Sequence, residues 1–222
     1  MGDAIGATLG PAVGIAISPT PIAAVILILF GGRARSNGVA FMLAWIVGVA
    51  AVTTVVVLIP GLEADGGGPS AVTGWIKLVL GVLLLVLGAR QWLSRPSPEE
   101  EPAVPGWMSR IDEMRPVAAS GLGLLLSALN PKNLLLAVAA GASIGALPLS
   151  AGETVGAVAT FTAVATLTVT VPVIGYLVAG RRLGPALERT KAWLITHDAA
   201  VMAVLLVVFG TSLVGDALQI LT

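Results

Sequence analysis

The sequence predicts an all-α membrane protein of six transmembrane helices, arranged as a 3+3 inverted repeat with Pro-broken first and fourth helices. Three observations support this prediction: a strongly apolar composition, six apolar runs of spanning length, and two proline motifs inside two of those runs. Hydrophobic residues make up 56% of the 222 residues and charged residues 11%, and the mean hydropathy is +0.98. Such a chain has too little polar surface to cover itself in water, so we expect a membrane protein.

The same composition argues against several classes of function. The formal net charge of +0 argues against nucleic-acid binding. The chain contains no cysteine, which excludes disulfides, thiolate metal sites and thiol redox chemistry. No carboxylate lies in the middle of an apolar run, which counts against a carrier of metal cations. We therefore expect no enzyme activity, no cofactor and no metal site.

Six apolar runs, each long enough to cross a ~30 Å hydrocarbon core as a helix, divide the chain. They cover residues 5–30, 39–59, 72–93, 117–142, 155–179 and 199–221. The first run has no basic segment before it and no convincing cleavage site after it, so we interpret it as a mature span. We expect a first three-helix repeat at 1–93, a cytoplasmic linker rich in proline and glutamate at 94–116, and a second three-helix repeat at 117–222.

Positive charge predicts the orientation of the spans. Ten of the twelve Lys and Arg residues lie after the first, third and fifth spans, whereas the opposite loops and the termini carry acidic residues. The positive-inside rule then places both termini outside the inner (plasma) membrane. The basic stretch 181–196 also contains apolar residues, and we interpret it as a short helix on the inner membrane surface.

Two proline motifs interrupt the first and fourth spans, offset by 112 positions: Ser18, Pro19, Thr20 and Pro21, and Asn130, Pro131, Lys132 and Asn133. Because three spans separate the copies, the two halves enter the membrane from opposite faces, and paired broken helices then indicate a substrate site near the midplane. Proline frees carbonyl groups before each break and bares amides after it. We expect Thr20 and Asn130 to be N-caps, so that two helix N-termini face the protein centre and suit an anionic oxygen.

Lys132 adds a full positive charge at this depth, where an ionisable side chain costs ~2.5–3.5 kcal/mol on insertion scales. Two interpretations stay open. The lysine either meets the anionic group of a substrate or caps carbonyl groups of the other half across a structural kink. We favour the substrate site, because the two motifs and the lysine occur together.

Polar and small residues recur every four positions in two spans. The first set is a face of the fifth span, which either lines a polar path or bonds back to its own helix: Thr162, Thr166 and Thr170. The second set lets another helix approach the first span closely: Gly2, Gly6, Gly10 and Gly14. For these glycines we favour internal packing, with a homodimer seam as the alternative.

At the two proline motifs the chain resembles the LysE superfamily of small six-helix exporters, in which a Pro-rich break in the first span is matched by Asn-Pro-Lys in the fourth. The motifs, the size and the long cytoplasmic middle loop look most like the actinobacterial GAP/Sap branch, the glycolipid- and sulfolipid-addressing proteins. This resemblance implies a transporter or flippase-like protein that moves a polar, anionic lipid or glycolipid from the inner membrane toward the cell surface, beside a larger lipid exporter. Some members of the superfamily are thiol oxidoreductases, an activity that this cysteine-free chain cannot have.

The predicted substrate-binding residues are the two proline motifs together with the threonine face: Ser18, Pro19, Thr20, Pro21, Asn130, Pro131, Lys132, Asn133, Thr162, Thr166 and Thr170. Two further functions compete with lipid transport. One is export of a small solute such as an amino acid, and the other is a non-transporting membrane subunit of a lipid export complex. A lateral opening between helices would favour a lipid, a closed aqueous cavity a solute, and a filled centre the subunit.

Overall fold

The computed structural model describes residues 1–62, 69–93 and 114–222, and its regular structure within these ranges is helical. The elements are α1 (Gly2–Ala16), α2 (Pro19–Phe30), α3 (Ala34–Val57), α4 (Ala71–Leu93), α5 (Pro116–Leu124), the π-helix η2 (Leu125–Leu129), α6 (Pro131–Gly145), α7 (Ala151–Ala179), the 3₁₀ helix η3 (Gly180–Leu183) and α8 (Gly184–Leu221).

Four helical segments are individually long and apolar enough to cross a membrane: α3, α4, α7 and Ala200–Leu221 of α8. Two bent pairs, α1 with α2 and α5–η2 with α6, bring the number to six if each pair is one span. The prediction of an all-helical, multi-pass membrane protein is thereby confirmed. The predicted breaks in the first and fourth spans are also present, as bends of 53° and 60°.

Two predicted segments differ from the structure or fall outside it. The helix predicted at 181–196 is not a short one, because Gly184 begins a helix that continues without interruption to Leu221, and its position on the membrane surface stays a prediction. The first part of this helix packs along α2, and Leu187 is buried there. Most of the predicted linker, residues 94–113, lies outside the described residues; its last residue, Pro116, already begins α5.

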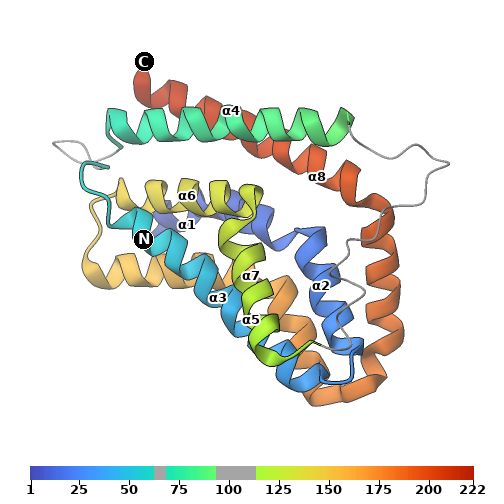
Figure 1. The fold of residues 1–222 in the computed structure, drawn as a ribbon. Helices are drawn as coiled ribbons and strands as arrows, with labels where there is room; N and C mark the ends of the chain where they lie inside the picture. Colours follow the sequence, from blue (N-terminus) through green and yellow to red (C-terminus); the bar gives the residue numbers. More distant parts are fainter. Residues whose placement is uncertain (63–68, 94–113) are drawn as a thin grey trace.

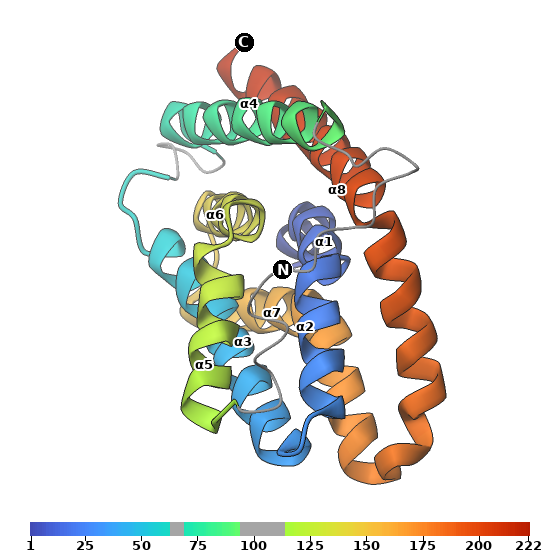
Figure 2. The same ribbon diagram turned by 45° about the vertical axis from the view of Figure 1, so that its right-hand side comes forward.

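The helices stack in layers (Figure 1). The C-terminal part of α8 runs beside α4 along the top of the view, above α6 and α1, while α2, α3, α5 and α7 lie below. The second view places α1 and α6 side by side beneath α4 (Figure 2). The two bent pairs therefore meet in the middle of the molecule, between the α4–α8 layer and α7.

Small residues make the seam between α4 and α8 very close. Gly74, Gly81 and Gly88 recur every seven residues of α4, and they face α8 at positions that include Ala203 and Gly210. A methyl group built on Gly81 would lie only 2.9 Å from the carbonyl oxygen of Gly210. Such small residues at a helix interface let backbones approach and gain van der Waals contact in a membrane.

An ion pair joins the same two helices near one end of the seam. Lys77 Nζ lies 3.1 Å from Asp216 Oδ2, and the Lys77 side chain is buried while that of Asp216 is half-exposed. Charge distribution alone did not predict this contact: Lys77 is one of the two basic residues outside the clusters that follow the first, third and fifth apolar runs. The pair satisfies a charge that would be expensive to leave alone between apolar helices.

The remaining packing follows a recurring pattern. Helix α3 packs on α5 and α7 packs on α1, while α4 packs on α6 and α8 packs on α2. Helix α3 also packs on α7, as α4 does on α8. Each long helix after the first break thus has a counterpart after the second with corresponding neighbours.

Candidate functional site

The first break lies at Ile17 and Ser18, directly before two prolines. The last backbone bond of α1 runs from Ile17 N to Val13 O at 2.9 Å. Pro19 then begins α2 as its first residue. Because proline has no N–H and restricts the residue before it to extended backbone, the helix cannot run through this point.

The second break has the same chemistry with a different preceding turn. Residues Leu125–Leu129 form a π-helix, Asn130 is extended with ψ 120°, and Pro131 begins α6. A π-turn inside a helical segment leaves carbonyl groups out of the ordinary i to i−4 register and often marks a functional site. No sequence signal had indicated this turn.

The N-cap prediction is correct at one break and wrong at the other. Asn130 Oδ1 accepts a hydrogen bond from the amide of Lys132 at 3.1 Å, as an N-cap should. In the first half the cap is Ser18 rather than Thr20, because the helix already begins at Pro19. The Ser18 hydroxyl does not cap its own helix but turns to the other motif.

Asn133 connects the two motifs. Its side-chain oxygen accepts a hydrogen bond from the Ser18 hydroxyl at 2.9 Å, and its side-chain nitrogen donates to the carbonyl oxygen of Leu126 at 2.9 Å. Asn133 is fully buried and Ser18 nearly so. The two segments, 115 residues apart in sequence, are thus held together by a side-chain contact that also satisfies a carbonyl freed at the second break.

Lys132 spans the same junction in the opposite direction. Its Nζ donates a 2.7 Å hydrogen bond to the carbonyl oxygen of Gly14, in the last turn of α1, and the residue is 3% exposed. The C-terminal end of a helix carries partial negative charge, so the ammonium group lies where the α1 dipole stabilises it. The sequence left open that this lysine caps a carbonyl group of the other half, and the structure contains that contact.

A third side chain completes the capping of α1. The Thr168 hydroxyl, on α7, donates to the carbonyl oxygen of Ala16 at 2.5 Å. Gly14 and Leu126, whose carbonyls accept from Lys132 and Asn133, are themselves separated by the 112-residue offset of the motifs. The freed carbonyls predicted before each break are real, and side chains of the second half satisfy them.

The threonine face of α7 lies in a groove between α3 and α7. The groove has a volume of about 1010 Å³ and a largely apolar lining. Thr162, Thr166 and Thr170 all line it, which confirms that they share one face. They do not join the helix breaks, because Thr168, which reaches the first break, is two residues from both Thr166 and Thr170 and so faces away from them.

The hydroxyl groups of that face differ in their bonding. Thr166 bonds back to the carbonyl oxygen of Thr162 at 2.8 Å, which is the local alternative expected for threonine in a helix. The hydroxyls of Thr162 and Thr170 are buried and have no hydrogen-bond partner among the described residues. Two hydroxyl groups of this helix are therefore buried beneath the groove surface without a partner among the described residues.

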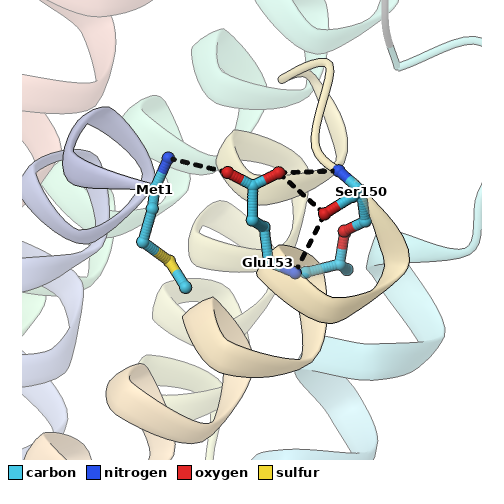
Figure 3. A network of polar contacts seen from close by, with 4 residues as sticks. Met1, Ser150 and Glu153 are labelled. Atoms are coloured by element: carbon cyan, nitrogen blue, oxygen red, sulfur yellow. Dashed lines mark hydrogen bonds and ion pairs between the residues drawn. The ribbon is translucent and has the colours of Figure 1, made fainter.

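One end of the groove lies at the first turn of α7, which a network of polar contacts fixes (Figure 3). Ser150 and Glu153 form a capping box, with the Glu153 carboxylate 3.0 Å from the Ser150 amide and 2.8 Å from its hydroxyl. The N-terminal amine of Met1 lies 3.9 Å from the same carboxylate. This network brings the start of α1 to the start of α7.

The four glycines spaced along α1 were predicted to pack inside the molecule, and the structure confirms this for two of them. Gly10 and Gly14 face the ring of Phe209 on α8, so internal packing is confirmed for them. Gly2 and Gly6 have open space where a side chain would point. The homodimer alternative stays a prediction for that end of the helix.

Sequence reasoning missed three contributors to these sites. Gly14 contributes only a backbone oxygen, for which no sequence pattern exists. Thr168 lies on the same helix as the predicted threonines but does not share their four-residue spacing, and so it points to another face. The α3 wall of the groove includes Ala50 and Thr54, and their four-residue spacing was the available signal.

The fold and the two breaks together define a polytopic membrane protein whose half-helices meet inside the molecule. The chain belongs to the family described as Sap, sulfolipid-1-addressing protein, because the model of that family matches residues 8–219. The resemblance to this family is thereby confirmed, whereas membership of the wider LysE superfamily stays an expectation. No curated protein and no solved structure matches the chain significantly.

Proposed function

We propose that the protein is a transporter or flippase-like protein that moves a polar, anionic lipid or glycolipid from the inner membrane toward the cell surface, without enzymatic chemistry. Membership of the sulfolipid-addressing family supports the lipid class. The observation that carries the mechanism is the buried ammonium group of Lys132, held between two broken helices by a carbonyl oxygen of the other half.

The helix breaks offer a small set of groups to an anionic headgroup. In the first turn of α2, Pro19 and Pro21 have no N–H, which leaves the amide of Thr20. In α6 the amide of Lys132 already bonds to Asn130, which leaves that of Asn133. A sulfate or phosphate oxygen would bind these two amides and the ammonium group, with both helix dipoles favouring negative charge.

Binding must compete with the contacts that close the junction. An anion that draws Lys132 toward itself removes the ammonium group from Gly14 O and so loosens the bond between α1 and α6. A ligand can shift a conformational equilibrium only by its difference in affinity for the two states. The exchange of a carbonyl oxygen for an anionic oxygen supplies such a difference, since hydrogen bonds between ions are the stronger ones.

A 3+3 inverted repeat supports alternating access in this proposal. Its support is the shared offset of the two breaks, the equivalent carbonyls at Gly14 and Leu126, and the corresponding neighbours of the helices in each half. In such repeats one half rocks against the other around a fixed site near the midplane. The cytoplasmic side would load the lipid and the outer side release it.

The test compares two buried lysines in reconstituted vesicles. Lys132→Met keeps most of the side-chain length and removes the charge, and Lys77→Met does the same in the α4–α8 seam. We expect Lys132→Met to reduce translocation of fluorescent phosphatidylglycerol to the rate of protein-free vesicles, and Lys77→Met to retain activity. Lys132→Arg should rescue only partly, because the guanidinium is planar and larger. Normal transport by Lys132→Met would eliminate this site.

A second candidate is supported by the closed state of the junction. Ser18, Lys132 and Asn133 are all engaged by protein groups, and a filled centre is what a non-transporting subunit of a lipid export complex would have. Purified protein that moves no lipid, yet restores surface lipid in a deletion strain even as Lys132→Met, would favour this role. The lateral groove between α3 and α7 gives less support to export of a small solute.

A further inference from the structure

We infer that Phe209 of α8 controls access to the junction between the two broken helices, so that an anion reaches Lys132 only when the ring of Phe209 moves aside. The inference deepens the proposed function and rests on it for the identity of that anion, a lipid headgroup. It assigns a role to a residue outside the two proline motifs, and access can be measured without any transport of lipid.

The ring of Phe209 packs on the last turn of α1. A methyl group built on Gly14 would lie 2.5 Å from a ring carbon, and one built on Gly10 would lie 3.5 Å from another. A side chain at Gly14 would therefore displace the ring. Gly14 is also the residue whose carbonyl oxygen accepts the 2.7 Å hydrogen bond from Lys132. Phe209 thus packs on the piece of backbone that holds the buried ammonium group.

The ring is the outermost of the groups that meet at Gly14. The same methyl group would lie 2.8 Å from Leu136 of α6, so α1, α6 and α8 come together at this point. Gly14 and Leu136 are buried, whereas Phe209 is partly exposed. Val13 and Ile17, which lie close to Gly14 in α1, are exposed as well. Movement of the ring would therefore open the junction toward the outer surface of the protein.

That surface has the depth that the proposed site requires. Phe209 lies near the middle of the membrane-spanning segment Ala200–Leu221, so the ring faces hydrocarbon close to the midplane of a bilayer. Figure 2 shows α1 and α6 side by side beneath the layer formed by α4 and α8. The groove between α3 and α7 does not offer the same approach, because its described lining includes no residue of the two proline motifs.

Helix α8 is held in place by other helices, so the ring can move while the helix stays. The neighbouring Gly210 packs against α4, where its carbonyl oxygen would lie 2.9 Å from a methyl group on Gly81. Gly184, at the start of α8, lies beside Phe30 at the end of α2. Rotation of one partly exposed side chain is a faster motion than the separation of packed helices. Phe209 can therefore uncover Gly14 without breaking the α4–α8 seam.

The alternative is that Phe209 only fills space between α1 and α8. Both roles predict that Phe209→Ala loses stability, because the substitution leaves a cavity. They differ in what becomes accessible. A packing role predicts no specific exposure of the junction, whereas access control predicts that the junction opens and that the rest of the core stays protected.

Thiol labelling measures access to the junction directly. The chain has no cysteine, so Ser18→Cys provides a single reporter at a position that is 2% exposed and bonded to Asn133. The full chain in detergent is treated with sulfonatoethyl methanethiosulfonate, a small anionic reagent. We expect Phe209→Ala to accelerate labelling by about tenfold or more, and Phe209→Leu to give an intermediate rate.

Two matched controls recognise a general loosening of the fold. Phe41→Ala removes the same ring from a fully buried position on α3, and it should leave the labelling rate of Ser18→Cys unchanged. Thr53→Cys, also fully buried on α3, should stay protected when it is combined with Phe209→Ala. The pair separates a local opening at α8 from an effect that any large cavity would have.

A comparison of reagent charge tests whether the opening leads to Lys132. The trimethylammonium analogue of the reagent is used beside the sulfonate, and each rate is divided by the rate of that reagent with a free thiol in solution. In Ser18→Cys with Phe209→Ala we expect the sulfonate to be favoured by about two- to tenfold, because the ammonium group of Lys132 attracts it. Lys132→Met should remove this preference.

Each outcome decides the inference. Equal labelling of Ser18→Cys across the Phe209 series, an equal acceleration by Phe41→Ala, exposure of Thr53→Cys, or no preference for the sulfonate would each overturn it. If Phe209 has no effect while Lys132→Met stops transport, the inference falls and the proposed function stands. If labelling follows Phe209 as expected while Lys132→Met transports lipid normally, the proposed function falls and control of access by Phe209 stands.

Discussion

At the scale of single residues, a few side chains satisfy the backbone carbonyl groups that the two helix breaks leave without a partner. A helix broken inside a membrane leaves carbonyl groups that water cannot satisfy. The side chain of Lys132 donates a hydrogen bond to Gly14 O, that of Thr168 to Ala16 O and that of Asn133 to Leu126 O. All three donors come from the second half of the chain, so the first break is closed only when both halves are assembled.

The most specific prediction at this scale concerns Asn133. Asn133→Leu leaves both Leu126 O and the Ser18 hydroxyl without their partner, whereas Ser18→Ala removes one bond and leaves only the Asn133 oxygen. At about 1–3 kcal/mol for each unsatisfied buried group, Asn133→Leu should lower thermal stability in detergent more than Ser18→Ala. Ser36→Ala, at an exposed position bonded to Arg33 O, is the control.

A double-mutant cycle then checks whether the two residues act through each other. The Ser18→Ala effect should shrink by about 0.5–3 kcal/mol in the Asn133→Leu background, because contacting residues couple by that amount. Simple additivity of the two changes would mean that the Ser18–Asn133 hydrogen bond does not hold the junction.

At the scale of helices, two features organise the molecule: the close packing of α4 against α8 and the two breaks between α1 and α2 and between η2 and α6. The α4–α8 seam depends on glycine, since a side chain added at Gly81 would lie 2.9 Å from Gly210 O and 3.0 Å from Val214 N, which are backbone atoms of α8 that cannot move aside. The breaks depend on proline. The seam joins two long helices, whereas each break joins two shorter helices whose ends lie inside the molecule.

Glycine substitutions separate packing from helix propensity. Gly81→Ala should destabilise the protein by about 1–3 kcal/mol through overpacking, because the added methyl would lie 2.9 Å from Gly210 O. Gly6→Ala meets nothing within 4 Å and should be neutral or stabilise by up to about 1 kcal/mol. Thermal unfolding measures both changes, and a stable Gly81→Ala protein would contradict the described seam.

Proline substitutions test whether the two breaks act as one site. Pro19→Ala with Pro21→Ala should restore an ordinary helix and withdraw the N-terminus of α2, and Pro131→Ala should do the same for α6. Residues that act as one unit are non-additive, so the combined variant should transport lipid scarcely more slowly than the worse of the two. Additive losses of transport accompanied by falling stability would indicate two independent kinks.

At the scale of the whole molecule, the sequence predicted what local chemistry determines. Apolar runs located the helices, prolines located the two breaks, and four-residue spacing placed Thr162, Thr166 and Thr170 on one face. The sequence did not predict contacts between segments that are far apart in the chain. These are the hydrogen bond from Lys132 to Gly14 O, the ion pair of Lys77 with Asp216, and the contribution of α3 to the second wall of the groove. The uninterrupted α8 was missed because its charged first part resembles a separate surface helix.

The number of spans is the global property on which the proposed transport mechanism depends, and the distribution of charge favours six. If each bent pair is a single span, all Lys and Arg residues other than Lys77 and Lys132 are expected on one side of the membrane. If both are re-entrant, α7 and α8 reverse their direction, and the connection between them would expose Arg181, Arg182, Arg189 and Lys191 on the opposite side. The positive-inside rule disfavours that arrangement.

Single cysteines in the cysteine-free chain distinguish the two topologies. Ser36→Cys must label from the cytoplasm and Ser70→Cys from outside in both, so they serve as controls for sidedness. With six spans, we expect Gly152→Cys to react only with an external impermeant maleimide and Thr190→Cys only after the cytoplasmic face is opened. With four spans these two positions exchange sides. Both residues are exposed, and Gly152 has open space around it, so labelling should not be limited by access. The exchanged pattern would place both bent pairs in re-entrant loops, and the 3+3 inverted repeat would have to be abandoned with them.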